Sequence, residues 1–114
     1  MSYRVEINND TFDREFRRLH KKFRSLKQDV DCLIGKLETN PFIGADLGGG
    51  VRKVRLAIGS KGKGKSHGAR VITYTTAIVN IDEEGIVTLV YIYDKGERDS
   101  LTSSEIEALL KTLR

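Results

Sequence analysis

Polar and apolar side chains alternate at the start of the chain, and the spacing then changes to one of three and four residues. Tyr3, Val5 and Ile7 are separated by charged residues, and this two-residue period predicts a short, half-buried strand. From Phe12 to Leu37 the apolar residues recur every three or four positions, as on one side of a helix. The chain therefore begins with a strand and continues into a helical region.

That helical region is too long for one straight helix in a protein of 114 residues. At 1.5 Å per residue it would span about 39 Å. Ser25 is the best capping residue inside it, so the sequence predicts two helices, over about 11–23 and 26–38. We expect them to form an antiparallel hairpin whose apolar stripe covers one side of a sheet.

Three later stretches are rich in β-branched and aromatic residues, which favours strands. The connector 82–85 is acidic and ends in glycine, as in a hairpin turn, and the connector 59–68 consists mostly of glycine, lysine and serine. The latter is interpreted as a flexible basic hairpin tip. The sequence therefore predicts an antiparallel meander of strands over 51–58, 69–81 and 86–93.

A final helix is predicted to start at Thr102 or Ser104. Each is followed three residues later by a glutamate, which is the spacing of a capping box. Isoleucine and leucine then recur at helical spacing from Ile106 to Leu113. Strand, helical hairpin, meander and last helix together fit one α+β domain, residues 1–114.

Charge changes this picture more than composition does. The net charge is only +4, but residues 47–81 contain no carboxylate at all. Such a block attracts polyanions, phosphate backbones above all, although a solvated basic surface is the alternative. The basic residues of this stretch are Arg52, Lys53, Arg55, Lys61, Lys63, Lys65 and Arg70.

Composition also suggests a compartment. The lone Cys32 leaves no disulfide framework and suits a reducing environment. The start, MSYRVEINND, is polar within a few residues and lacks the apolar stretch of a signal peptide, which argues against secretion. No run approaches the roughly 20 apolar residues of a membrane span. We therefore expect a cytoplasmic protein that does not contact the membrane.

Strand parity gathers part of the basic block on one face. Val54 and Leu56 share the parity of a buried face, so Lys53 and Arg55 point side by side from the open face. Arg70 opens the next strand, and Tyr93 follows at the end of the last one. Such groups suit cleavage of RNA by its own 2′-hydroxyl without a metal, because cations stabilise charge on the phosphate oxygens. The alternative is an exposed strand kept soluble by its charges.

Two further local patterns concern other chemistries, namely acid–base chemistry at His67 and nucleotide binding by residues 59–66. His67 is either an acid or base in the basic loop or a bystander, and no Cys/His pair with metal-ligand spacing occurs, so we expect neither a metal nor a cofactor. Residues 59–66, GSKGKGKS, match the nucleotide-binding pattern G-x-x-x-x-G-K-S. A P-loop requires a following helix, whereas a strand is predicted from Ala69, so nucleotide hydrolysis is rejected.

Three segments carry a resemblance to a known family: SLKQDVDCLIGKLETNP, LGGGVRKVRLAIGSKGKGKSHGARVITY and LVYIYDKGERDSLTSSEIEALL. Over nearly its whole length the chain resembles the RelE/ParE superfamily of type II toxins, and within it the HigB-like members. The resemblance implies helices packed on one face of the sheet and a ribosome-dependent, metal-independent mRNA endonuclease that leaves cyclic or 3′-phosphate ends. It also implies, as partners, a cognate antitoxin, mRNA in the ribosomal A site, and rRNA.

The resemblance also implies roles for individual residues. Lys53 and Arg55 would bind and activate the scissile phosphate, Arg70 would stabilise the transition state, and Tyr93 with Lys95 would complete the site. Gly96 and Thr102 stand where RelE has an arginine and a tyrosine, so Tyr93 or Asp94 would serve as acid or base. The expected RNA contacts are Arg52, Lys61, Lys63, Lys65 and His67.

Two other functions remain open at this point. ParE-like toxins share the fold and inhibit DNA gyrase, but such an inhibitor has no need of phosphate-binding side chains gathered around Lys53, Arg55 and Arg70. The same surface could also belong to an inactive module that binds RNA or the ribosome without cutting.

Overall fold

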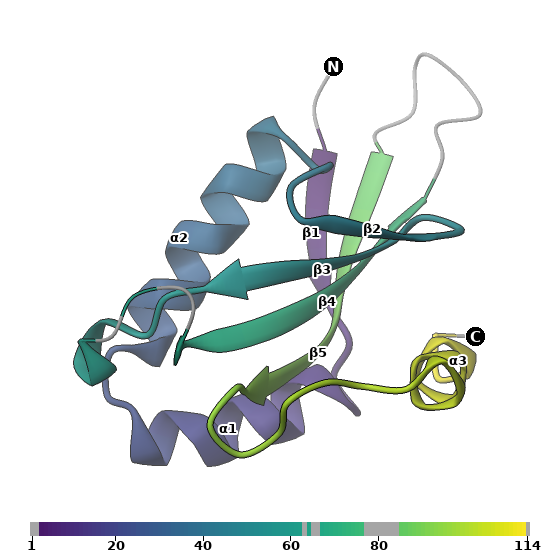
Figure 1. Ribbon diagram of the computed structural model, residues 1–114. Coiled ribbons are helices and arrows are strands. Elements are labelled where there is room, and N and C mark those ends of the chain that lie inside the picture. The colour runs from purple at the N-terminus through teal and green to yellow at the C-terminus, as the bar shows by residue number, and fades with distance from the viewer. Residues whose placement is uncertain (1–2, 63, 65–66, 77–84, 114) are drawn as a thin grey trace.

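The computed structural model describes residues 3–62, 64, 67–76 and 85–113 and consists of a five-stranded sheet with three helices (Figure 1). The strand order is β1-β5-β4-β3-β2. The elements in chain order are β1 (Tyr3–Ile7), α1 (Phe12–Lys22), α2 (Leu26–Thr39), β2 (Ala45–Gly48), β3 (Val51–Leu56), the short 3-10 helix η1 (Gly59–Lys61), β4 (Ala69–Thr76), β5 (Gly85–Asp94) and α3 (Ser103–Lys111).

The predicted strand, helices and meander are confirmed. β3, β4 and β5 pair antiparallel, and both N-terminal helices agree with their predicted ranges within one residue at each end. The part of the second strand predicted over 77–81, and most of the acidic connector, lie outside the described residues. Two pairings were not predicted: β1 lies parallel to β5, and the short β2 pairs with β3.

The main core lies between the sheet and the first two helices. Thr11 and Ser25 stand at the N-caps of α1 and α2. The two helices meet at the connection 23–25 and diverge from there in Figure 1, rather than lying side by side as in the expected hairpin. They bury the apolar stripe that the spacing predicted. The largest fully buried side chains of this layer are Phe12, Leu19, Leu26, Leu37, Val54, Ile58, Val71, Val87, Leu89 and Ile92.

The C-terminal helix corrects one expectation. Thr102 caps α3, and its side chain and that of Glu105 form the predicted capping box. However, α3 packs on the opposite face from α1 and α2, over a second apolar cluster built on Val51, Ile72 and Val90 (Figure 1). The helices therefore do not all share one face, and α3 covers only one end of the face that was expected to be open.

Candidate active site

Three candidate residues form one row across the uncovered end of the sheet. Arg55 on β3 is paired with Arg70 on β4, and Arg70 is paired with Tyr93 on β5. Lys53 lies two residues before Arg55 and has the same parity. Val54, Leu56 and Ile58 are buried beneath the helices, so the predicted division of faces is confirmed.

A shallow groove of about 500 Å³ runs beside this row. Its basic side chains are those of Lys53, Arg55, Arg70 and Lys95, and none of the described residues that line it is acidic. The groove wall at Gly44 depends on glycine: φ is +100°, and a Cβ there would lie 2.5 Å from the carbonyl oxygen of Lys53. The fold thus brings four predicted catalytic residues to one groove.

Arg70 and Tyr93 are more buried than an open sheet face would leave them. Arg70 is 7% exposed, and its guanidinium donates to the carbonyl oxygen of Ala69 at 3.1 Å. Tyr93 is 4% exposed, and its hydroxyl has no hydrogen-bond partner among the described residues. Burial raises the pKa of the Tyr93 phenol above its ordinary value of 10, although nearby Arg70 opposes the shift. The shift keeps the Tyr93 phenol in its neutral, protonated form at neutral pH.

Lys95 is held by an acidic residue that the sequence analysis did not select. Its ammonium group donates to the Asp99 carboxylate at 2.6 Å and to the Asp99 carbonyl oxygen at 2.8 Å. The pKa of Asp99 is lowered first by Lys95 and further by the charges of Lys53 and Arg70. The spacing of four residues between Lys95 and Asp99 is the signal in the sequence that could have suggested the pair.

Asp94, the alternative acid or base, is enclosed instead. Its side chain is 2% exposed and lies 2.7 Å from the Lys61 ammonium and 3.8 Å from that of Lys22. The backbone N–H of Gly96 donates to the same carboxylate at 3.1 Å. The ammonium groups of Lys61 and Lys22 also lie over the Phe23 ring, at 5.1 and 5.2 Å from its centre respectively. This arrangement makes Asp94 an anchor between α1, the basic loop and the end of β5.

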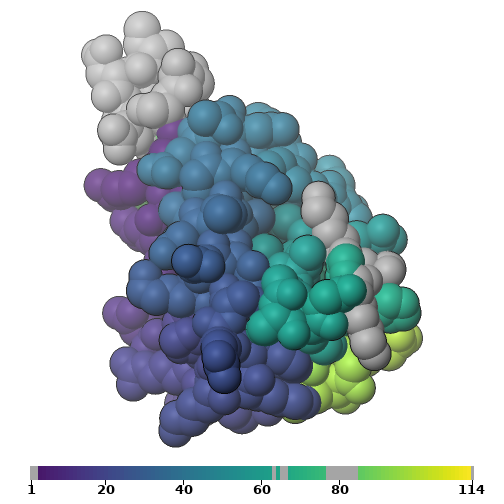
Figure 2. Space-filling view, turned by 90° about the vertical axis from the view of Figure 1, so that its left-hand side faces the viewer, coloured from purple at the N-terminus to yellow at the C-terminus, as the bar shows by residue number. Residues whose placement is uncertain are grey.

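The first residues of the basic loop, 59–61, are fixed to the rest of the molecule. The backbone N–H groups of Gly59 and Ser60 donate to Asp29 at 3.1 Å and to Ser25 at 2.8 Å, at the start of α2. Figure 2 shows the teal surface around residue 60 directly against the blue surface of the helices. The expectation of a flexible tip does not hold for these residues, because five hydrogen bonds hold the loop to Ser25, Asp29 and Asp94.

The predicted RNA contacts are dispersed. Lys61 turns inward, where it also donates to the carbonyl oxygen of His67 at 2.9 Å, while the His67 side chain is exposed. Arg52 has the parity of the opposite face, where it lies 4.9 Å from the Phe42 ring centre and 3.9 Å from Asp46. Neither Lys61 nor Arg52 joins the groove. Lys63 and Lys65 lie outside the described residues.

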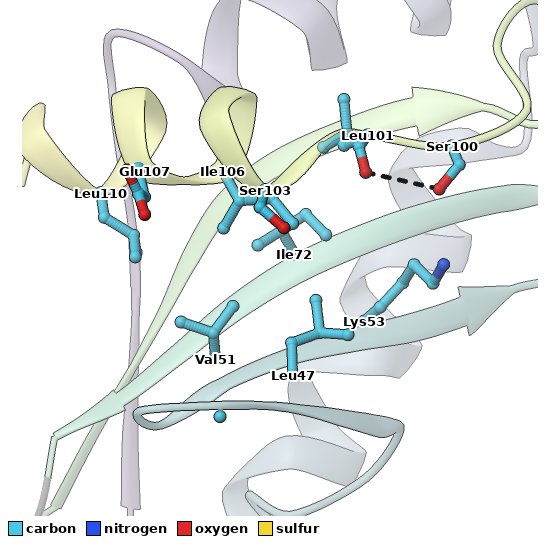
Figure 3. A pocket seen from close by; sticks show the side chains of 11 residues that line it. Leu47, Val51, Lys53, Ile72, Ser100, Leu101, Ser103, Ile106, Glu107 and Leu110 are labelled. Atoms are coloured by element: carbon cyan, nitrogen blue, oxygen red, sulfur yellow. Dashed lines mark hydrogen bonds between the residues drawn. The ribbon is translucent and has the colours of Figure 1, made fainter.

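A second, apolar groove of about 470 Å³ separates α3 from the β2–β3 hairpin (Figure 3). Leu47, Val51 and Ile72 line one side, and Ile106 and Leu110 of α3 line the other. Lys53 also borders this groove and so connects it with the basic one. The two grooves divide this face of the sheet into an apolar end and a cationic end.

The described residues offer neither a group that could hold a metal ion nor a helix that could cross a membrane. Within the described ranges no three His, Cys, Asp or Glu side chains lie close enough together to hold a metal ion. None of the described helices combines the length and apolar character that crossing a membrane requires. The P-loop interpretation is rejected by the structure as well, because β4 and not a helix follows the Gly/Lys loop.

Comparison with protein families adds the identity that geometry alone does not supply. Residues 9–113 match the family described as the RelE toxin of the RelE/RelB toxin–antitoxin system. The match spans nearly the whole chain and includes every element from α1 to α3. It agrees with the α+β architecture and with the family resemblance of the sequence segments, and it implies an antitoxin as partner. The chain therefore belongs to the RelE toxin family of toxin–antitoxin systems.

Proposed function

We propose that this toxin is a ribosome-dependent mRNA endonuclease. The observation that carries the proposal is the row of Arg55, Arg70 and Tyr93 across three paired strands, with Lys53 and Lys95 on the same groove. Four cations around one groove can bind a phosphodiester and stabilise its negative charge, and the phenol of Tyr93 is the proposed proton donor. This combination serves phosphoryl transfer better than it serves a protein-binding surface.

The proposed reaction is attack by the RNA 2′-hydroxyl on the adjacent phosphorus. The bond from phosphorus to the 2′-oxygen forms while the bond to the 5′-oxygen breaks, and the 2′-hydroxyl proton is released to solvent water, which leaves a 2′,3′-cyclic phosphate. Lys53, Arg55 and Arg70 would stabilise the charge that grows on the other phosphate oxygens. Tyr93 would give its proton to the departing 5′-oxygen. Every one of these roles uses a side chain of the chain itself.

The proposed macromolecular partners are mRNA in the ribosomal A site, rRNA, and an antitoxin. The acid-free stretch 47–81 supports the first two, since phosphate backbones favour a cationic surface. Such a toxin would act in the cytoplasm. Membership of the HigB-like branch stays a prediction from the sequence.

The test is a reconstituted translation reaction with a defined message and added toxin. Primer extension should reveal codon-spaced breaks that require ribosomes, and the 5′ fragments should end in cyclic or 3′-phosphate. An intact message would contradict the proposal. A parallel supercoiling assay with DNA gyrase then separates a gyrase inhibitor from an inactive RNA-binding module, and ribosome co-sedimentation identifies the latter.

A further inference from the structure

One exposed carboxylate lies at the edge of the cationic groove. Lys95 lines the groove together with Lys53, Arg55 and Arg70, and the Asp99 carboxylate contacts Lys95 at 2.6 Å. Asp99 belongs to the turn between β5 and α3, and its side chain is 93% exposed. No role has so far been given to this carboxylate, although it is bound to one of the four cations of the groove.

Asp99 acts on more than its immediate partner. Lys53 and Arg70 also favour its ionised form, so the carboxylate lies within the field of three of the four groove cations. It therefore offsets part of the positive charge that a phosphate would meet. An exposed ion pair of this kind contributes little to stability, so a competing anion can displace it easily.

We propose that Asp99 is an intramolecular competitor for the phosphate site: its carboxylate occupies Lys95 in the RNA-free protein, and an RNA phosphate displaces it. The inference rests on the proposed function only in taking an RNA phosphate as the ligand. Asp99 is thus a residue that tunes binding and does not take part in the chemistry. Because Lys95 also contacts the Asp99 carbonyl oxygen at 2.8 Å, its side chain stays near the groove after the carboxylate has moved away.

The experiment measures RNA binding without cleavage. A labelled single-stranded RNA with 2′-O-methyl groups throughout has no attacking hydroxyl, so its fluorescence anisotropy reports binding alone. Asp99→Asn is expected to lower the dissociation constant about three- to tenfold, the effect of removing one charge at close range in a solvated site. The gain should shrink as salt is added.

Matched variants separate this effect from a general change in charge. Lys27 and Asp31 on α2 form an equivalent pair, four residues apart and 3.0 Å between charged atoms, but do not line the cationic groove. Asp31→Asn should leave RNA binding unchanged. In a Lys95→Ala background, Asp99→Asn should increase RNA affinity much less than it does in the wild-type background, because Lys95 is no longer there to be competed for.

Unchanged or weaker binding by Asp99→Asn would overturn the proposal, as would an equal gain in Asp31→Asn. Failure of the endonuclease proposal looks different. In that case the wild-type toxin leaves ribosome-bound messages intact, while Asp99→Asn still binds the uncleavable RNA more tightly than wild type does.

Discussion

Arg55 and Arg70 face each other directly across the antiparallel pairing of β3 and β4. Like charges at opposed positions of a sheet repel each other and destabilise the pairing. Arg70 is only 7% exposed, so solvent screens the repulsion less than it would at the surface. A pair that costs stability and gathers charge at a groove is typical of a functional site.

The first prediction concerns Arg70 itself. Arg70→Ala should lower ribosome-dependent cleavage by about 100-fold or more, because a charge partner of the transition state is lost. The variant should remain folded, since relief of the repulsion with Arg55 offsets part of the lost packing. Primer extension measures the cleavage, and circular dichroism the folding. Arg17→Ala is the matched control: Arg17 is 76% exposed and paired with Asp13 on α1. Full cleavage by Arg70→Ala would remove Arg70 from the proposed chemistry.

The second prediction is that Tyr93→Phe lowers cleavage while leaving the stability of the protein almost unchanged. Its buried hydroxyl has no described hydrogen-bond partner, so Tyr93→Phe loses no such contact and should change the free energy of unfolding by less than about 1 kcal/mol. If the phenol donates the proton to the leaving oxygen, cleavage should fall by about 100-fold. Chemical denaturation and cleavage are measured on the same preparation. Unimpaired cleavage would show that another group protonates the 5′-oxygen.

The sequence predicted the two faces of β3 but not what covers them. Alternation over Val54, Leu56 and Ile58 placed Lys53 and Arg55 on the other side of β3, as observed. The period of two carries no information about a helix that packs there later. The apolar side of α3 was evident from its spacing, yet spacing is the same whichever face of the sheet the helix covers.

Ion pairs between residues far apart in the chain could not be predicted from the sequence either. Lys61 and Asp94 are separated by 33 residues, and no local sequence pattern distinguishes Lys61 from an ordinary solvent-exposed lysine. Arg52 was grouped with Lys53 by its charge, although its own parity assigned it to the opposite face. β2 escaped detection because its four residues are all exposed and show no alternation.

The enclosed Asp94 predicts a large loss of stability. In Asp94→Asn the amide cannot offset the charge of Lys61, which is only 18% exposed, so an ammonium group is left partly buried without its partner. The free energy of unfolding should fall by about 2–4 kcal/mol. Asp46→Asn is the control, because Asp46 is 66% exposed and lies 3.9 Å from Arg52, and it should change stability by less than about 0.5 kcal/mol. Equal effects in urea denaturation would show that Asp94 is no anchor.

The ion pair of Glu97 with Arg18 predicts that the stability of the protein depends on pH. Arg18 on α1 binds its carboxylate through two nitrogens, at 3.0 and 2.8 Å, and lowers the pKa of Glu97 below its ordinary value of 4.5. A lowered folded-state pKa means that the stabilisation is present above about pH 4.5 and is lost as the pH falls through the folded value. The difference in urea midpoint between wild type and Glu97→Gln should therefore be largest near neutral pH and shrink in acid. Arg18→Ala should remove most of the same pH-dependent difference, because among the described residues only the Lys22 ammonium at 3.7 Å then remains to favour the ionised carboxylate. A constant difference at all pH values would contradict the assignment.

Two glycines predict opposite effects of the same substitution. A Cβ at Gly68 would lie 2.1 Å from the carbonyl oxygen of Leu56, so Gly68→Ala forces the ends of β3 and β4 apart. The free energy of unfolding should fall by about 2–3 kcal/mol. The carbonyl oxygen of Gly68 also accepts a hydrogen bond from the backbone N–H of Lys95 at 3.0 Å, so the groove should be distorted and cleavage reduced.

Gly35 on α2 is the matched control, because no atom lies within 4 Å of a Cβ added there. Gly35→Ala should stabilise the protein by about 0.5–1 kcal/mol without changing cleavage. Thermal melting of both variants measures the difference, and two shifts of the same sign would show that the close approach at Gly68 does not determine its effect.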